Sequence, residues 1–428
     1  MDCPRQLRLK ASITLADQAV TSAAAFCLNI LLVRWMEPFE YGAFVTAFAV
    51  FLFLSRFHQA LLLEPMAVFA WSEYKGRLAE YLRTSLHLHW VIGCGLGLLP
   101  AVAGFAFGSA GFRQAWTFAA MGVAAPMVLL QWTLRRMAYL AGDPALALRG
   151  AAVYAFALIA GICGLQYSSR LSPEAVWLVP AIGALASSAS MWPGVGLAWK
   201  RQPGARADWR AAALLHWSYG RWAAAFSATD ALSEALYLPL IAAVLGLRQA
   251  GLFRAMENLL QPIQMTMASF ALLGLPIIAE TLKTEGHRFL AQAGRKVPAA
   301  TAILCGSYAV LLVGAAPGLI RFLYGREAYA EALGILPLLA VTLVCRTLGD
   351  GSWGILIRAA SRPDVMFWGS AAGAAVSLLF GVPCLMFWGI KGAAIARMAS
   401  AAVFMLSVLA GFLVILKGSR PDAALRAT

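Results

Sequence analysis

The chain has 428 residues, of which 61% are apolar and 13% are charged, and its formal net charge is +14. Soluble domains carry about 25% charged residues, so this composition excludes an ordinary soluble globule and indicates a protein embedded in lipid. The seven cysteines stand singly, without a CxxC motif or a Cys/His spacing that suits zinc. We therefore expect the cysteines to be packing residues, and we expect no metal site.

Twelve apolar stretches approach the roughly 20 residues that a helix needs to cross a bilayer. In chain order they cover 11–33, 41–64, 84–107, 113–134, 146–166, 174–198, 217–244, 249–278, 298–320, 328–349, 364–387 and 391–416. The longest hydrophilic segments, near 71–83, 200–210 and 280–296, are too short for a soluble catalytic domain. The sequence therefore predicts an all-α polytopic membrane protein without a soluble catalytic domain.

The basic residues are distributed unevenly between alternate loops. If the N-terminus is cytoplasmic, far more Lys and Arg residues fall in cytoplasmic loops than in outer loops, and the positive-inside rule then places both termini in the cytoplasm. No basic run is interleaved with aromatic residues as in a nucleic-acid groove. We expect membrane lipids as partners and no nucleic acid.

The two halves of the chain share landmarks at an offset near 210 residues. The turn 36–44 (MEPFEYGAF) corresponds to 245–253 (LGLRQAGLF), Pro65 to Pro276, and 141–144 (AGDP) to 360–363 (ASRP). A chance similarity between two Ala- and Leu-rich halves is the alternative. Duplication of a six-helix unit would give two bundles of the same orientation, an architecture common among alternating-access carriers.

The predicted organisation follows from this duplication. We expect an N-terminal six-helix lobe over 1–199, a cytoplasmic linker over 200–212, a C-terminal six-helix lobe over 213–416 and a cytoplasmic tail over 417–428. The two bundles should be pseudo-symmetric.

Several motifs resemble one family of transporters. The segments 15–20 (LADQAV), 31–42 (LLVRWMEPFEYG), 58–65 (HQALLLEP), 142–144 (GDP) and 389–396 (GIKGAAIA) are similar to the polysaccharide transporter branch, the Wzx-type oligosaccharide flippases, of the multidrug/oligosaccharidyl-lipid/polysaccharide (MOP) exporter superfamily. The resemblance implies a MATE-like fold with two six-helix bundles around a central cavity. The chain ends after the twelfth span, whereas lipid II flippases of this superfamily typically carry two further helices, which disfavours a lipid II substrate.

The same resemblance implies a function. It predicts a flippase that moves a polyprenyl-pyrophosphate-linked glycan, a precursor in polysaccharide biosynthesis, across the bacterial plasma (inner) membrane, with other polysaccharide-assembly proteins as further partners. No cofactor is expected, although H⁺ or Na⁺ coupling is open. The alternatives are a cation-coupled multidrug or small-molecule exporter of the same superfamily and a membrane-embedded enzyme of surface-polysaccharide assembly.

The stretch 249–278 carries a single polar stripe. Its members are spaced by three, four and three residues, which places them on one face of a helix; they are Arg254, Glu257, Gln261 and Gln264. A polar stripe on an apolar helix must turn away from lipid, so we predict a substrate-binding wall that contacts sugar hydroxyls and pyrophosphate. In the alternative, Arg254 pairs with Glu257 and the glutamines bond to a neighbouring helix.

A second substrate-binding candidate lies in the stretch 41–64. Arg56 sits about 12 Å from the cytoplasmic end of its apolar run at helical rise, and Gln59 shares its face. A guanidinium offers fork-like donors suited to a diphosphate. The alternative role of Arg56 is an ion pair with Asp17 on the neighbouring helix.

Three carboxylates are candidates for ion coupling. A charge at mid-membrane costs about 2.5–3.5 kcal/mol on insertion scales, so each needs a partner or a cavity. Asp230 and Glu234 share a face at i and i+4, and Asp17 lies within the first span. The alternative for all three is a salt bridge to Arg221, Arg254 or Arg56. By the same spacing Arg346 is expected to pair with Asp350, whereas the sequence does not place Arg397.

Overall fold

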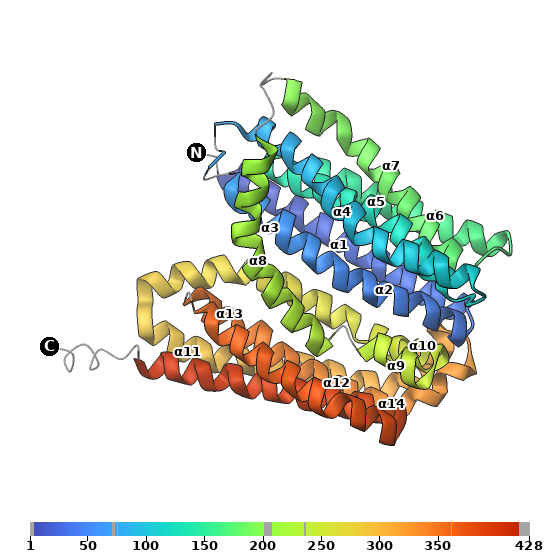
Figure 1. The fold of residues 1–428 in the computed structure, drawn as a ribbon. Helices are drawn as coiled ribbons and strands as arrows, with labels where there is room; N and C mark the ends of the chain where they lie inside the picture. The colour runs from blue at the N-terminus through green and yellow to red at the C-terminus, as the bar shows by residue number, and fades with distance from the viewer. Residues whose placement is uncertain are drawn as a thin grey trace. The chain divides into compact units, whose positions relative to one another are not determined.

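The structure is a computed structural model that describes residues 4–70, 73, 74, 76–200, 208–234, 237–360 and 362–418. Throughout these residues the regular elements are helices, which confirms the all-α prediction (Figure 1). Nine segments within them are long and apolar enough to cross a membrane, against the twelve predicted. These segments support a multi-pass membrane protein.

The difference in number has two sources. Helix α14 (Pro363–Gly418) covers the predicted spans 364–387 and 391–416 as one element. Gly389 lies between them with φ 59° and ψ -142°, a left-handed conformation that glycine adopts without steric cost, so the chain changes direction there. The predicted spans 217–244 and 249–278 include residues or side chains outside the described ones.

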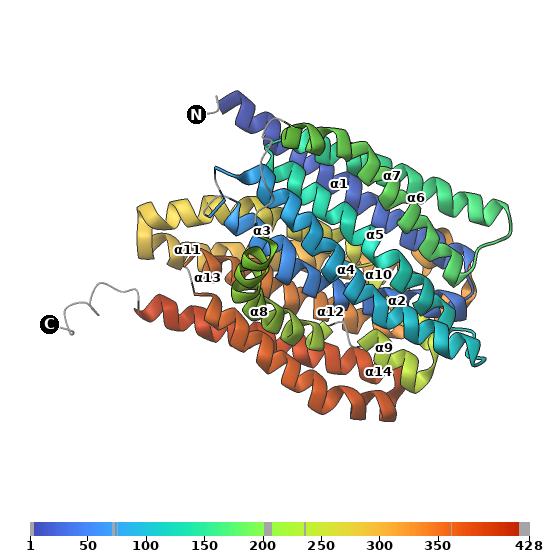
Figure 2. The same cartoon turned by 45° about the horizontal axis from the view of Figure 1, so that its top comes forward.

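The contacts divide the chain into two compact units, Met1–Ala228 and Thr229–Thr428. The helices of the first unit are α1 (Pro4–Trp35), α2 (Pro38–His58), the π-helix η1 (Gln59–Leu63), α3 (Glu64–Phe69), α4 (Leu78–Ser109), α5 (Ala115–Leu140), α6 (Pro144–Tyr167), α7 (Pro173–Lys200) and the first part of α8 (Trp209–Glu234). Helix α5 is central to this unit, because α2, α4, α6 and α7 all pack against it (Figure 2).

Turn residues in the sequence determine where some of these helices begin. Gly142 has φ 78°, Asp143 accepts a hydrogen bond from the Leu146 amide at 3.1 Å, and Pro144 opens α6. The carboxylate thus caps one of the amides that a helix N-terminus leaves without a partner, and proline is suited to the first helical position. The GDP motif is therefore a helix start signal.

Glycines allow α4 and α5 to pack backbone against backbone. A Cβ atom added to Gly104 would lie 2.3 Å from the Ala119 amide nitrogen, and one added to Gly97 would lie 2.4 Å from the Gly122 carbonyl oxygen. Close approach through small residues is a common way for helices to associate in lipid. The contact leaves no room for a side chain at either position.

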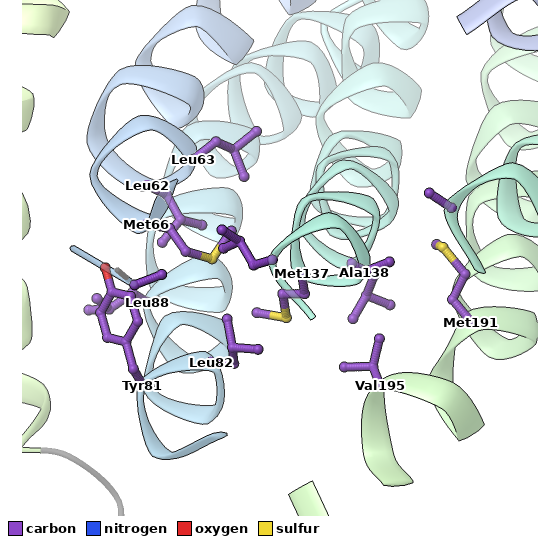
Figure 3. Close-up of a cluster of buried hydrophobic side chains, with 14 of the residues drawn as sticks. Leu62, Leu63, Met66, Tyr81, Leu82, Leu88, Met137, Ala138, Met191 and Val195 are labelled. Carbon is purple, nitrogen blue, oxygen red and sulfur yellow. The ribbon is translucent and has the colours of Figure 1, made fainter. Parts of the chain in front are cut away.

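The core of the first unit near α3 contains side chains from several helices (Figure 3). The labelled members are Leu62, Leu63, Met66, Tyr81, Leu82, Leu88, Met137, Ala138, Met191 and Val195. Met66, Met137 and Met191 are fully buried there, and such flexible thioether side chains fill irregular gaps between helices.

The start of α8 also packs into the first unit. His216 Nδ1 lies 3.1 Å from the Leu61 carbonyl oxygen, and Tyr81 Oη lies 2.6 Å from His216 Nε2. A carbonyl only accepts, so Nδ1 donates to Leu61 and Nε2 accepts from the tyrosine. These contacts explain why the contact boundary lies at Ala228, later in the chain than the predicted linker over 200–212.

The second unit contains the remaining helices. They are α9 (Tyr237–Leu245), α10 (Leu247–Asn258), α11 (Gln261–Leu323), the 3₁₀-helix η2 (Glu327–Ile335), α12 (Leu336–Arg346), the π-helix η3 (Thr347–Trp353), α13 (Gly354–Ala359) and α14. Helix α11 bends at Gly286, which has φ 61°. Helix α14 contacts α9, η2, α12, η3 and α13, so it is central to this unit.

Candidate functional site

A polar pocket lies within the second unit. It has a cavity volume of about 70 Å³ and is lined by four helices, α10, α11, α12 and α14. We call it the arginine pocket; its lining residues are Arg254, Glu257, Leu260, Gln261, Gln264, Leu339, Thr342, Leu343, Arg346 and Arg397. All four residues of the predicted stripe are therefore together in one pocket.

The stripe stays on one face although the helix is interrupted. Helix α10 ends at Asn258 and α11 begins at Gln261, with Pro262 in its first turn. Proline is tolerated there because the first amides of a helix have no partner within the helix. Arg254 and Glu257 come from α10, while Gln261 and Gln264 come from α11.

The carboxylate of Glu257 lies between two guanidinium groups. Arg254 Nη1 donates to Glu257 Oε2 at 3.1 Å, and Arg397 from α14 forms an ion pair with Oε1. The three side chains are 15%, 10% and 19% exposed for Arg254, Glu257 and Arg397. The expected Arg254–Glu257 pair therefore forms, and it lines a cavity within the second unit; substrate binding by the stripe stays a prediction.

Arg346 enters the same pocket, contrary to the expected pair with Asp350. The Asp350 carboxylate accepts a hydrogen bond from Arg358 at 2.7 Å, and the Arg346 guanidinium lies 4.5 Å from the centroid of the Phe404 ring. The π-helix η3 begins directly after Arg346. A π-helix has a wider turn than an α-helix, so residues four apart no longer stack and an i,i+4 pair is not favoured.

The pocket is strongly positive as a result. Its lining contains three arginines and one glutamate, a formal charge of +2. The amides of Gln261 and Gln264 and the hydroxyl of Thr342 add neutral hydrogen-bonding groups. This combination suits an anion that also carries hydroxyl or amide groups.

In the first unit, Asp17 is held by two residues of α5. Its Oδ2 atom accepts from Arg135 Nη2 at 2.5 Å and from Tyr139 Oη at 2.6 Å, and its side chain is only 2% exposed. The expected alternative of a salt bridge is therefore present, with Arg135 in place of Arg56. The partner is 118 residues away in sequence, on a helix that the charge pattern did not indicate.

The other predicted site residues come from α2, η1 and α8. Arg56 is half-buried near the end of α2, and the Gln59 amide donates to Glu64 Oε1 at 3.4 Å. Both belong to the first compact unit, whereas the arginine pocket belongs to the second. Asp230 and Glu234 lie in α8, and their side chains are outside the described ones.

A buried histidine pair in the first unit was missed by the sequence reasoning. His58 Nε2 lies 3.1 Å from His89 Nδ1, and Thr133 Oγ1 lies 3.5 Å from the former atom and 3.3 Å from the latter. The three residues come from α2, α4 and α5 and are fully buried. No local spacing could indicate the pair, because the two histidines are 31 residues apart.

Comparisons with known proteins identify the fold. Neither a protein-family model nor a curated protein matches the chain. Among solved structures, an inward-facing multidrug resistance MATE family transporter of the MOP superfamily has a TM-score of 0.77 at 10% identity, covering 95% of this chain and 98% of that one. The chain has the fold of that protein.

Two further structures with this fold show that it serves several substrates. The lipid II flippase MurJ in an inward closed conformation has a TM-score of 0.69 at 11% identity, covering 96% of this chain and 90% of that one. A MOP superfamily transporter from Pyrococcus furiosus, described by the reverse polarity of its binding pocket, has a TM-score of 0.66 at 11% identity, covering 96% and 95%. At such identities the likeness establishes the fold alone, and the function must be argued from the site.

Proposed function

We propose that the protein is a flippase or exporter that moves a lipid-linked oligosaccharide or polysaccharide precursor across the bacterial plasma membrane by alternating access. The observation that carries this proposal is the arginine pocket, with three arginines and one glutamate inside a MOP fold. The expected cargo is a polyprenyl-pyrophosphate-linked glycan, and the expected membrane is the inner one with both termini cytoplasmic.

The chemistry of the pocket fits the parts of that cargo. A diphosphate carries several anionic oxygens, and guanidinium groups bind phosphates through paired, directional hydrogen bonds. The amides of Gln261 and Gln264 and the Thr342 hydroxyl can bond to sugar hydroxyls beside it. The lipid tail needs no polar site, because it can stay in the bilayer while the head group enters the pocket.

The first unit would contribute residues of its own. We propose that Arg56 and Gln59 bind substrate from that unit, and that Asp17 of the same unit and Asp230 and Glu234 of the second unit are the candidates for coupling to H⁺ or Na⁺. In this proposal the Asp17–Arg135 pair is one state of the transport cycle. No cofactor is needed, and other proteins of polysaccharide assembly are the expected partners.

The two alternative functions are less well supported by the pocket. Export of cationic drugs would require a pocket of the opposite sign, because a net charge of +2 repels a cation. A membrane-embedded enzyme would need a nucleophile or a general acid/base beside the anion. Among the described residues that line the pocket, the only acidic one is Glu257, and both its oxygens already face arginines.

The proposal is tested by deleting the gene and extracting lipid-linked oligosaccharides from each face of the membrane. We expect the complete glycolipid to accumulate on the cytoplasmic face and to return to normal with the wild-type gene, but not with Arg254→Ala. Arg248→Ala is the matched control, because Arg248 lies on the same helix but pairs with Glu331 at 2.6 Å outside the pocket. Normal levels of completed glycolipid on the outer face of the deletion strain would reject the function.

A further inference from the structure

The arginine pocket already contains an anion of its own. Glu257 accepts a hydrogen bond from Arg254 at Oε2 and forms an ion pair with Arg397 at Oε1, so the guanidinium donors of both residues face this carboxylate. These are donors that a phosphate would also use. The proposed substrate and the Glu257 carboxylate are therefore competitors for the same two arginines.

Space and charge strengthen this competition. The cavity is small, about 70 Å³, so a diphosphate that engages both arginines comes close to the Glu257 carboxylate. An ionised Glu257 would also repel the incoming anion at close range, where little water is present to screen the charges. Both costs vanish when the carboxylate takes up a proton, because the neutral acid no longer competes for the guanidinium donors.

We propose that Glu257 is an exchangeable counter-ion, whose protonation is linked to the binding of a diphosphate by Arg254 and Arg397. In this exchange one proton passes from water to a Glu257 carboxylate oxygen, and the diphosphate oxygens replace that carboxylate on the two arginines. Substrate and proton therefore enter the pocket together. The inference rests on the proposed function for the identity of the anion.

The other charged groups described around Glu257 do not include a second carboxylate. Arg254 faces it from α10, Arg346 lines the pocket from α12, and Arg397 faces it from α14. Tyr237 of α9 interacts electrostatically with Arg397, and the residues from α11 are the neutral Gln261 and Gln264. Arginine does not titrate in proteins, so we place the proposed proton exchange on Glu257, the acidic residue among those described in the pocket lining.

Linkage determines the sign of the effect. If protonation of Glu257 favours anion binding, anion binding favours protonation by the same factor. Wild-type affinity for a diphosphate should therefore fall as the pH rises, whereas Glu257→Gln resembles the protonated acid at every pH. A role of Glu257 confined to tying α10 to α14 would give no such difference in proton uptake.

The test uses the purified full-length protein in lipid nanodiscs and inorganic pyrophosphate as the probe. Binding is measured calorimetrically at pH 6, 7 and 8, in two buffers of different ionisation enthalpy, so that proton uptake is obtained with affinity. Pyrophosphate itself titrates in this range, and the comparison between wild type and Glu257→Gln removes that contribution. Glu331→Gln is the matched control, because Glu331 pairs with an arginine of α10 and is 54% exposed.

We expect the wild type to take up more protons per pyrophosphate than Glu257→Gln, and we expect the variant to bind about tenfold more tightly at pH 8, within the usual range of coupling. Glu331→Gln should behave as the wild type. Equal proton uptake in wild type and Glu257→Gln would overturn the proposal, and so would a folded Glu257→Gln protein that no longer binds pyrophosphate.

Two further arms keep the result decisive. If Glu257→Gln does not fold, Glu257→Asp is measured in its place. The exchange is overturned if the proton uptake on binding, in both the wild type and Glu257→Asp, equals the uptake expected from the titration of pyrophosphate alone. If the gene deletion leaves glycolipid export normal while proton-linked pyrophosphate binding is found, the proposed function fails and the exchange stands for another anionic cargo. Glycolipid accumulation without proton-linked binding would overturn the exchange and support the proposed function.

Discussion

Removal of the Arg135 side chain should destabilise the first unit strongly. The Asp17 side chain is 2% exposed, and Arg135 provides the positive charge 2.5 Å from its Oδ2 atom. In Arg135→Ala the carboxylate stays buried, with Tyr139 as its remaining donor at 2.6 Å. Loss of one partner from a buried pair costs about 3–5 kcal/mol, because an uncompensated charge is left in a medium of low polarity.

A graded set of variants tests this reasoning. Tyr139→Phe removes a hydrogen bond to a charged group, which contributes about 1.5–3 kcal/mol. Arg77→Ala breaks an exposed pair with Glu80, in which Arg77 is 61% exposed, and such pairs contribute about 0–1 kcal/mol. The expected order of destabilisation is therefore Arg135→Ala, then Tyr139→Phe, then Arg77→Ala.

The assay is reversible unfolding of the purified protein in mixed micelles, followed by tryptophan fluorescence. The double variant Asp17→Asn/Arg135→Met removes both charges, so it should recover much of the stability that Arg135→Ala loses. A free energy of unfolding for Arg135→Ala within about 1 kcal/mol of the wild type would refute the reasoning. That result would show that the Asp17 carboxylate finds water or another partner when the arginine is removed.

Two further predictions concern packing and transport. Gly104→Ala should destabilise the protein by about 1–3 kcal/mol in the same unfolding assay, because the added Cβ would lie 2.3 Å from a backbone nitrogen of α5. The control is Gly95→Ala, which should not destabilise the protein, because its added Cβ would have no atom within 4 Å. Equal stability of the two variants would contradict the close α4–α5 contact. Under the proposed function, Arg346→Ala should reduce glycolipid export as we expect for Arg254→Ala, because both residues line the arginine pocket. Arg358→Ala removes a partner of the exposed Asp350 and should leave export near wild type. Export that depends on Arg358 and not on Arg346 would argue against the pocket as the binding site.

Local patterns in the sequence were sufficient for the class of protein and for part of the site. Apolar runs of about 20 residues predict the all-α membrane architecture, because such a run spans the bilayer as a helix that satisfies its own backbone hydrogen bonds. The spacing of Arg254, Glu257, Gln261 and Gln264 predicts a shared face, and the structure places all four in one pocket. Such inferences succeed because they depend on residues only a few positions apart.

The partners of these residues depended on the tertiary structure. Arg397 reaches Glu257 from a helix 140 positions later in the chain, and Arg135 reaches Asp17 across 118 positions. The π-helix η3 begins directly after Arg346 and includes Asp350, and Arg346 lines the pocket while Asp350 pairs with Arg358. Charge spacing along one helix cannot predict such contacts, because they are determined by which helices pack together and by where each helix is interrupted.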